Sequence, residues 1–187
     1  MTRHLRAPRA RRPGLHALAA AALLAACSPD SILDVTDPDI INPEDISSLA
    51  GAEALRIGAL RQFNEATSGD ESMFLYGGLL ADEWRSGDTF NQRDETDKRS
   101  VQRSNANIDD AWRDIHHARV ASQLAIRGYE RFAPPQTYKI GEMYMLQAYT
   151  EILLAEHFCS GVPLSTIQDG DVVFAPGSPT QGVFGRA

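Results

Sequence analysis

The segment QTYKIGEMYMLQAYTEILLAEHF, residues 136–158, carries the strongest indication of the fold. It follows Pro134-Pro135, through which a helix does not continue. Its large apolar residues project in every direction around a helix: Met143, Met145, Leu146, Tyr149, Ile152, Leu153, Leu154 and Phe158. A helix that is apolar on all sides is covered by neighbours on several of them. We therefore expect a core helix here, with Met143, Met145 and Tyr149 in the core.

Small residues recur at every seventh position of this helix, at Gly141, Ala148 and Ala155, where a second helix can approach closely. The preceding helix is predicted to begin at the cap residue Asn107 and to end before the two prolines. One face of it is apolar except for Arg119, and consists of Ile108, Ala111, Trp112, Ile115, Ser122, Ile126 and Tyr129. Two helices joined by a short turn, with small residues at their contact, are typical of a tetratricopeptide-like hairpin. The predicted fold class is therefore all-α.

Two more helices are expected on the N-terminal side of this hairpin. Asn42-Pro43-Glu44-Asp45 combines a cap, a first-turn proline and two acids, which together predict a helix start. This helix should end near Asn64, before Ser68-Gly69, and a shorter helix should follow over about residues 71–83. The first helix would bury a stripe that Glu53 interrupts and that consists of Ile46, Leu49, Ala50, Ile57 and Leu60.

Residues 85–106 have no periodicity and are almost wholly polar. A structureless stretch of about twenty residues inside a compact domain is uncommon, and such stretches tend to be functional or mobile. We therefore expect a long polar loop and place the candidate site there. Trp84, beside this loop, either stacks on a ligand or packs the loop onto the helices, and the sequence leaves both possibilities open.

The last residues predict a further helix. Ser178-Pro179-Thr180-Gln181 matches a capping box with proline at the first helical position. The chain ends six residues later. A helical solenoid needs about three repeats and capped ends, whereas one hairpin and the start of another are visible here. We therefore expect the helical region, residues 42–187, to be an incomplete part of a truncated fold.

Residues 1–26 have the pattern of a signal peptide. All their charges are positive, and residues 15–26 are almost wholly apolar. At ~1.5 Å per residue this apolar run covers about 18 Å of a ~30 Å hydrocarbon layer, which is too short to span it. Leu24-Ala25-Ala26-Cys27 resembles the bacterial lipobox, in which small residues admit the peptidase and the cysteine thiol accepts the lipid. We expect lipidation at Cys27 and a tether over residues 27–41; the alternative is an ordinary secretory signal.

The remaining residue patterns argue against catalysis, metal binding and nucleic-acid binding. The formal net charge of −7 disfavours a protein that coats nucleic acid, and the interleaved charges of residues 93–103 indicate a solvated loop. His116-His117 diverge by ~100° on a helix, which favours a solvated pair over a metal site. Cys159 is expected to be a small buried apolar residue. The sequence contains no nucleophile-elbow, metalloprotease or phosphate-loop motif, so we predict a non-enzymatic protein without cofactors or metals.

Several segments together resemble the SusD/RagB family of outer-membrane nutrient-binding lipoproteins. The resemblance spans nearly all of residues 27–187 but only the N-terminal part of a family member, and the order of the segments makes it specific. The segments are Leu33-Asp34-Val35-Thr36-Asp37-Pro38, Asn42-Pro43-Glu44, Gly51-Ala52, Gly78-Leu79-Leu80-Ala81-Asp82-Glu83, Trp112, Gln147-Ala148-Tyr149, Leu153-Leu154-Ala155-Glu156 and Phe158-Cys159-Ser160-Gly161-Val162-Pro163-Leu164-Ser165.

The resemblance implies a lipoprotein on the surface of the outer membrane, built on a tetratricopeptide-like frame. Such a protein would bind an oligosaccharide or a peptide and deliver it to a SusC-like TonB-dependent transporter. The family's ligand-lining segment corresponds here to Asp82, Trp84, Arg85, Phe90 and Asn91. Indole and phenyl faces suit a sugar ring, while Asp, Asn and Arg satisfy its hydroxyls. The alternatives are a structural helical-repeat lipoprotein that organises other envelope proteins and, third, a hydrolase whose catalytic half is missing.

Overall fold

The computed structural model describes residues 47–69, 71–87, 89–168 and 171–187, all within the compact unit Ile41–Ala187. The predicted signal peptide, Cys27, the tether and the predicted helix start at Asn42 lie outside the described residues. Among the helices of the described part, none is long and apolar enough to cross a membrane.

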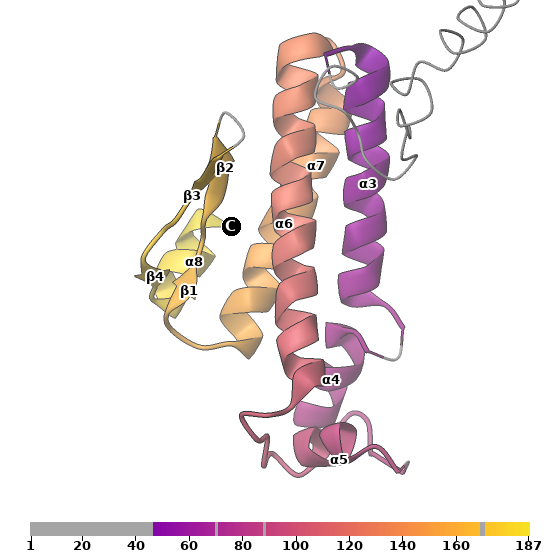
Figure 1. Ribbon diagram of the computed structural model, residues 1–187, viewed down its shortest axis with the longest axis vertical. Helices are drawn as coiled ribbons and strands as arrows, with labels where there is room; N and C mark the ends of the chain where they lie inside the picture. Colours follow the sequence, from indigo (N-terminus) through magenta and orange to yellow (C-terminus); the bar gives the residue numbers. More distant parts are fainter. Residues whose placement is uncertain (1–46, 70, 88, 169–170) are drawn as a thin grey trace, which may run out of the picture. The chain divides into compact units, whose positions relative to one another are not determined.

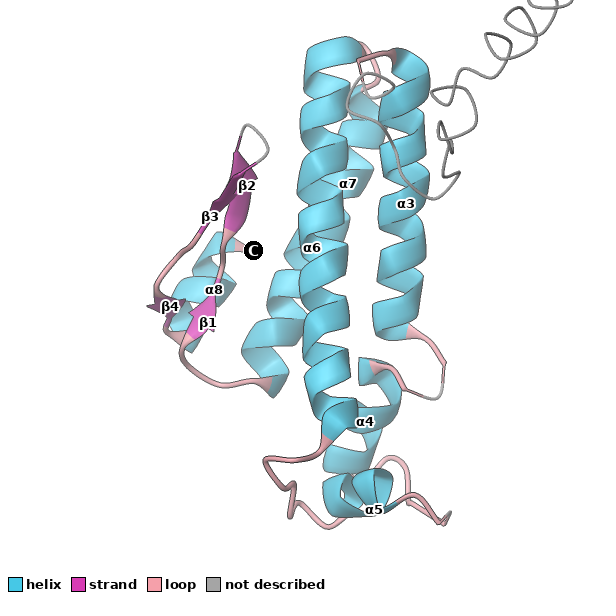
Figure 2. Cartoon of the chain, in the orientation of Figure 1, coloured by secondary structure: helices cyan, strands magenta, loops and turns pink. Residues whose placement is uncertain are grey.

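Helices make up most of the described chain, as the prediction of an all-α fold requires. They are α3 (Leu49–Thr67), α4 (Met73–Leu80), α5 (Asn91–Asp97), α6 (Ala106–Phe132), α7 (Thr137–His157) and α8 (Thr180–Arg186). Between α7 and α8 lie the short strands β1 (Val162–Pro163), β2 (Thr166–Gln168), β3 (Asp171–Val173) and β4 (Gly177–Ser178). β1 pairs with β4 and β2 with β3, both antiparallel, with Val162 opposite Ser178 and Ile167 opposite Val172. The helices α3, α6 and α7 form a bundle, with α4 and α5 at one end and the β ribbons and α8 along one side (Figures 1 and 2).

Alanines form the contact between α3 and α6. Because their side chains are so short, the two antiparallel helices can approach closely along their length. Gly128 of α6 also lies at this contact, since a Cβ there would be 3.0 Å from Leu55 Cδ1 and 3.6 Å from Ala52 Cα on α3. The fully buried alanines recur every seven residues on each helix, and are Ala52, Ala59 and Ala66 on α3 and Ala111, Ala118 and Ala125 on α6.

The predicted buried stripe of α3 is therefore wrong. Leu49, Ala50 and Ile57 are exposed, and Leu60 is half-buried, while Ile46 lies outside the described residues. The prediction placed the large aliphatic side chains of this helix in the core. The side that is buried against α6 instead carries alanines, because only small side chains fit between the two helices. On α6, by contrast, the predicted apolar face is buried or half-buried throughout, and Arg119 within it is buried as well.

The prediction that α7 is covered on all sides is also wrong. Met143 is buried as expected, but Met145 and Tyr149 are exposed. Gly141 is exposed too, with open space where a Cβ would lie. The neighbours of α7 in the described chain, α3, α6 and α8, therefore leave one side of this helix in solvent. Of the small residues predicted at its helix contact, Ala155 is buried, Ala148 is half-buried and Gly141 is exposed.

A cluster of charged groups around Glu53 joins the three long helices. Glu53 on α3 accepts hydrogen bonds from Lys139 Nζ on α7, at 2.6 Å, and from the Tyr129 hydroxyl on α6. Arg56 lies 3.0 Å from Glu53 and donates to Glu142 on α7 at 2.5 Å. The hydrogen bonds from Lys139 and Tyr129 lower the pKa of Glu53 to about 2. Glu53, which interrupts the predicted stripe, thus connects α3 to α6 and α7 through hydrogen bonds.

The predicted breakers Ser68-Gly69 and Pro134-Pro135 end α3 and α6 as expected, but α3 does not extend back over residues 47–48 and α6 begins earlier than predicted. α3 begins at Leu49, because the Ser48 hydroxyl accepts a hydrogen bond from the Gly51 N–H at 3.0 Å. α6 is capped by Asn105 rather than by Asn107.

Two segments adopt conformations that were not predicted. Residues 91–97 form α5 inside the predicted polar loop, and Thr96 of this helix is fully buried. Ser178 pairs with Val162 in a β ribbon and so does not cap α8. The Ser160 hydroxyl instead accepts a hydrogen bond from the Thr180 N–H at 3.4 Å. The helix α8 is present as predicted, but its start depends on a residue distant in the sequence.

Candidate functional site

The predicted ligand-binding residues lie around α4 and the start of α5, at one end of the bundle (Figure 1). Trp84 packs across Gly78, where a Cβ would lie only 1.7 Å from Trp84 Cδ1. The Trp84 and Phe74 rings are 5.7 Å apart between centroids. Trp84, Phe90 and Phe74 are nevertheless 45%, 56% and 64% exposed. Trp84 therefore packs its segment onto α4 and still offers ring surface to solvent. We call Phe74, Trp84 and Phe90 the aromatic surface.

The polar members of the predicted set are all exposed, but they differ in their contacts. Asp82 has a positive φ of 61° and pairs with Arg99 at 2.5 Å. Asn91 is the first residue of α5 and follows Phe90 directly, while Arg85 follows Trp84. The Asp82 carboxylate is therefore engaged by Arg99. Arg85 and Asn91 are the sequence neighbours of Trp84 and Phe90.

Hydrogen bonds hold the segment that carries the aromatic surface against the start of α6. Asn107 Nδ2 donates to the Tyr76 hydroxyl at 2.8 Å, and that hydroxyl donates to Glu71 at 3.0 Å. Asn105 Nδ2 donates to Glu95 of α5 at 2.9 Å. Burial raises the pKa of Tyr76 to about 12, so its hydroxyl remains a neutral donor near neutral pH. These hydrogen bonds fix the segment that carries the aromatic surface to the start of α6.

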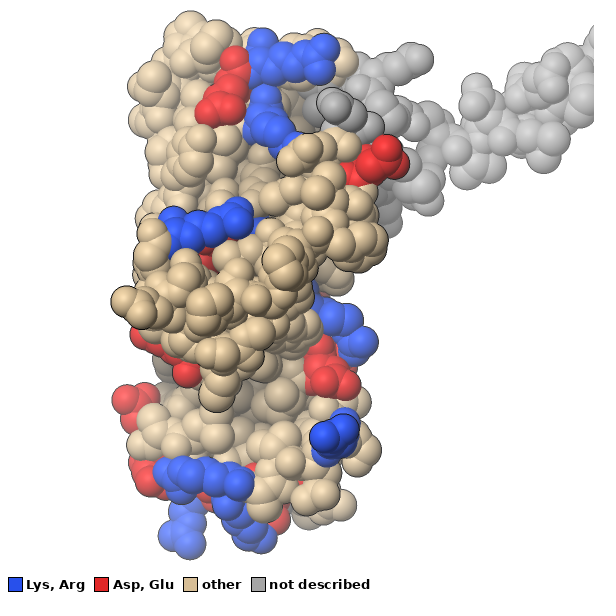
Figure 3. Space-filling model, turned by 90° about the vertical axis from the view of Figure 1, so that its left-hand side faces the viewer, with Lys and Arg blue, Asp and Glu red and all other residues tan. Residues whose placement is uncertain are grey.

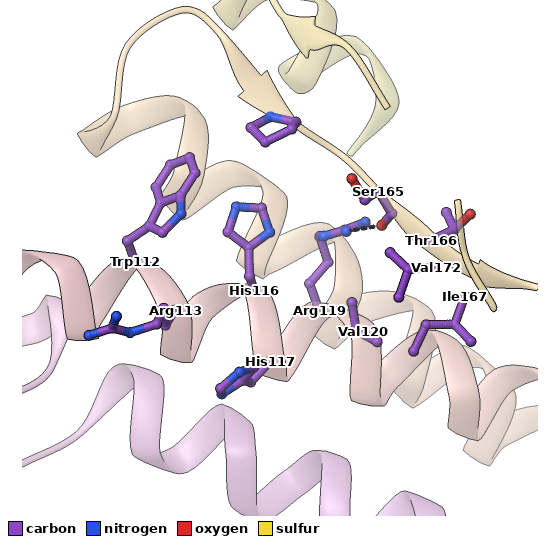
Figure 4. Close-up of a pocket in the computed structure, with 11 residues that line it drawn as sticks. Trp112, Arg113, His116, His117, Arg119, Val120, Ser165, Thr166, Ile167 and Val172 are labelled. Atoms are coloured by element: carbon purple, nitrogen blue, oxygen red, sulfur yellow. Dashed lines mark hydrogen bonds between the residues drawn. The ribbon is translucent and has the colours of Figure 1, made fainter. Parts of the chain in front are cut away.

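A second candidate is a hollow of about 310 Å³ between α6 and the strands β1 to β3 (Figure 4). This volume is at the lower end of the range for small-molecule sites. Figure 4 shows Trp112, His116 and Arg119 projecting from α6 toward the segment that carries Ser165. The surface over the ribbons and α8 is mostly uncharged (Figure 3). Of the described residues that line the hollow, none carries a carboxylate; they are Trp112, Arg113, His116, His117, Arg119, Val120, Pro163, Ser165, Thr166, Ile167 and Val172.

Two arginines of α6 hold the ribbon over this hollow through backbone carbonyls. Arg119 Nη2 donates to the Ser165 carbonyl, and Arg127 Nη1 donates to the Ile167 carbonyl. The Ser165 hydroxyl accepts a further hydrogen bond from the Ala175 N–H at 3.1 Å. The arginines lie 46 and 40 positions from their acceptors in the sequence. The shape of the hollow therefore depends on long-range contacts.

Arg119 and Glu151 form a buried ion pair that the half-exposed side chain of Arg186 joins from the surface. Arg119 and Glu151 are each 1% exposed, and their Nη1 and Oε1 atoms lie 3.7 Å apart. Arg186 Nε is 3.3 Å from the same oxygen, and Gln147 Nε2 donates to it at 3.2 Å. Burial lowers the pKa of the Arg119 guanidinium, while Glu151 acts in the opposite direction; a guanidinium stays charged in proteins. Two arginines thus share one carboxylate.

His116 contributes a second buried nitrogen to the hollow. Within the described residues its Nε2 atom has no hydrogen-bond partner, and its ring lies edge-on to Trp112 with 4.5 Å between centroids. Burial, and to a lesser degree the charge of Arg119, lowers the pKa of His116 to about 4. The imidazole is therefore neutral near pH 7. The predicted solvated pair is right for the exposed His117 and wrong for His116, because packing against Trp112 removes His116 from water.

Of the other residues singled out from the sequence, Cys159 is exposed rather than buried, because it lies where the chain leaves α7 at a positive φ of 57°. Trp112 packs edge-on against Phe158 at 4.7 Å, in agreement with its predicted packing role. Lys98 and Arg99 are exposed, as expected for a solvated segment. Searched over the described residues, His, Cys, Asp and Glu side chains form no group of three that could hold a metal ion.

The pairing of Arg119 with Glu151 was not predicted, although the sequence contains a signal for it. Arg119 interrupts the apolar face of one predicted helix, and Glu151 lies among the apolar residues of the next. A buried charge requires an opposite partner, so two such interruptions on neighbouring helices indicate a buried pair. The contact of Arg119 with the Ser165 carbonyl has no comparable signal in the sequence.

Comparisons with protein-family models, with curated proteins and with solved structures found no match for this chain.

Proposed function

We propose that this protein is a non-catalytic lipoprotein of the outer-membrane surface. It binds an oligosaccharide or a peptide and delivers it to a SusC-like TonB-dependent transporter. In this proposal a lipid on Cys27 anchors the chain, and α6 and α7 form a tetratricopeptide-like hairpin of the SusD/RagB frame. The support comes from the resemblance of the sequence to that family, from the lipobox and from the helical architecture of the described chain.

The observation that carries the proposal is the exposure of Phe74, Trp84 and Phe90 on one segment. Large aromatic side chains are usually buried or found at interfaces, so exposed rings suit a surface that binds something. The faces of such rings can stack on the C–H groups of a pyranose, while Arg85 and Asn91 offer partners for hydroxyls. Because hydrogen bonds already fix the segment that carries the rings to the start of α6, binding would cost less conformational entropy.

Titration calorimetry of the full chain against a panel of oligosaccharides and peptides tests this function. Trp84→Ala is expected to weaken the best ligand by about tenfold, the effect of losing one stacking contact. Tyr138→Ala is the matched control, because Tyr138 is an aromatic residue of α7 that is 70% exposed and lies outside the aromatic surface. The proposal is overturned if no panel member binds, or if Trp84→Ala and Tyr138→Ala both bind like the parent.

The anchor has its own test. Metabolic labelling with a fatty acid is expected to modify the parent chain and to leave Cys27→Ser unlabelled, since only the thiol can form the thioether. Equal incorporation into both chains would refute lipidation at Cys27.

A second candidate function, a helical-repeat lipoprotein that organises other envelope proteins, is favoured by the exposed side of α7. Tyr138, Met145 and Tyr149 lie at helical spacing on this side and are all exposed. An apolar stripe of this kind suits a helix of another protein. Under this function, Met145→Glu would abolish copurification with envelope partners and Trp84→Ala would not.

A further inference from the structure

Phe174 is the most exposed large apolar side chain of the described residues. It follows β3 directly and is 84% exposed. The backbone is held on both sides of it, because Val173 pairs with Thr166 of β2 and the Ala175 N–H donates to the Ser165 hydroxyl at 3.1 Å. Thr166 and Ser165 both line the hollow between α6 and the β ribbons. A fixed backbone thus presents an uncovered phenyl ring beside this hollow.

The walls of the hollow suit a phenyl ring. Val120 of α6, Ile167 of β2 and Val172 of β3 are among its apolar lining residues. Val172 is 53% exposed, so this wall is open to solvent and to an incoming side chain. An apolar cavity of ~150 Å³ already binds benzene, and the hollow has a volume of about 310 Å³. It therefore admits a phenylalanine side chain, yet Phe174 does not line the hollow of its own chain.

The surface around the ring favours a second copy of this chain as the partner. Val173 and Phe184 are each 44% exposed, and the surface over the ribbons and α8 is mostly uncharged (Figure 3). Two such surfaces can meet with little charge repulsion. Each copy carries both a ring and a hollow, so an arrangement with two-fold symmetry satisfies both at once. A partner of different sequence would have to supply both features itself.

We propose that the protein forms a symmetric dimer in which Phe174 of each copy enters the hollow of the other copy. An aromatic side chain buries ~200 Å², and two such insertions, counted with the walls they cover, bury on the order of 700 Å². This area is below the ~1,200 Å² of a standard interface, so we expect a weak dimer with a dissociation constant on the order of tens of micromolar. The proposal uses no residue of the aromatic surface, so it stands or fails separately from the proposed function.

Sedimentation equilibrium of the full chain in density-matched detergent measures the association. At about 300 μM the parent should be mostly dimer and form nothing larger, because reciprocal insertion closes the assembly. Phe174→Ala is expected to raise the dissociation constant by about tenfold or more, since each dimer loses two inserted rings. Tyr138→Ala is the matched control, because Tyr138 of α7 is 70% exposed and lies outside the proposed interface. It should change the dissociation constant by less than about twofold.

A mixing experiment tests whether the ring and the hollow belong to the same contact. Val120→Phe fills the hollow from α6 and leaves Phe174 in place, so alone it should weaken the association by about tenfold. A mixture of Phe174→Ala and Val120→Phe restores one insertion, because the first variant keeps its hollow and the second keeps its ring. The mixed dimer should therefore be tighter than the dimer of either variant. Circular dichroism of each variant confirms that its helices are intact; if Val120→Phe fails to fold, the comparison of Phe174→Ala with Tyr138→Ala decides.

The inference is overturned by any of four results. These are a parent chain that stays monomeric at about 300 μM, assembly beyond the dimer, equal dissociation constants for Phe174→Ala and Tyr138→Ala, and a mixture that associates no more tightly than its two components. A monomeric parent would leave a protein of different sequence as the partner of this surface.

Discussion

Replacing Glu53 with glutamine should destabilise the protein near neutral pH and lose most of its effect in acid. The carboxylate of Glu53 joins α3 to Lys139 of α7 and Tyr129 of α6, and it also pairs with Arg56. Glutamine keeps the size of the side chain and one accepting oxygen but removes the charge. The substitution therefore isolates the electrostatic contribution of the Glu53 carboxylate to the contacts between the helices.

The magnitude follows from the pKa of Glu53, which is about 2 in the folded protein against an ordinary value of 4.5. At 1.36 kcal/mol per pKa unit, this difference corresponds to at most about 3.4 kcal/mol of unfolding free energy. The Glu53 side chain is 32% exposed, so screening by water reduces the expected value to about 1–2 kcal/mol. Because folding lowers the pKa, the stabilisation is complete above 4.5 and is lost as the pH falls toward 2.

Urea unfolding of the full chain, followed by far-ultraviolet circular dichroism at about pH 7 and about pH 3, measures this effect. At about pH 3, less than half of the difference between the parent and Glu53→Gln should remain. Glu156→Gln is the matched control, because Glu156 is an exposed acid on α7. The reasoning is refuted if Glu53→Gln costs no more than Glu156→Gln near neutral pH, or if its cost is the same at both pH values.

Three further substitutions test the packing. Gly58→Ala adds a methyl group to open space within α3 and should raise the unfolding free energy by about 0.5–1 kcal/mol; an unchanged urea midpoint would contradict this. Ala118→Leu enlarges a fully buried contact residue and should lower the unfolding free energy by about 1–3 kcal/mol, while Ala106→Leu, at an exposed position of the same helix, should change it by less than about 0.5 kcal/mol. Gly78→Ala would place its Cβ 1.7 Å from Trp84 Cδ1, so the indole must move and its fluorescence maximum should shift to longer wavelength; an unaltered spectrum would disprove the packing of Trp84 on α4.

The features that sequence predicts well are those with a strong local cause. Pro134-Pro135 separates α6 from α7 because proline cannot continue a helix. The apolar face of α6 was found because its spacing matches the helical period over more than five turns. The helix α8 was expected from the motif Ser178-Pro179-Thr180-Gln181, and the structure contains a helix that begins at Thr180.

The features that sequence misses depend on partners distant in the chain. Ile57 was assigned to the core and Ala59 was not, because a hydrophobic pattern gives weight to size, while close helix contact requires small residues. Ser178 matches a local capping motif, but it pairs with Val162 in a β ribbon. The motif covers only neighbouring residues and so carries no information about this distant partner. The hollow is assembled from α6 and a ribbon about forty positions later, so its lining could not be foreseen from either segment alone.

The ribbon over the hollow is held by Arg119 and Arg127 through main-chain oxygens, which every amino acid possesses. Thr166 and Ile167 can therefore be exchanged in the course of evolution without loss of the attachment. Related chains can in this way diversify the wall of the cavity while the scaffold stays constant, much as an antibody varies its loops on an invariant framework.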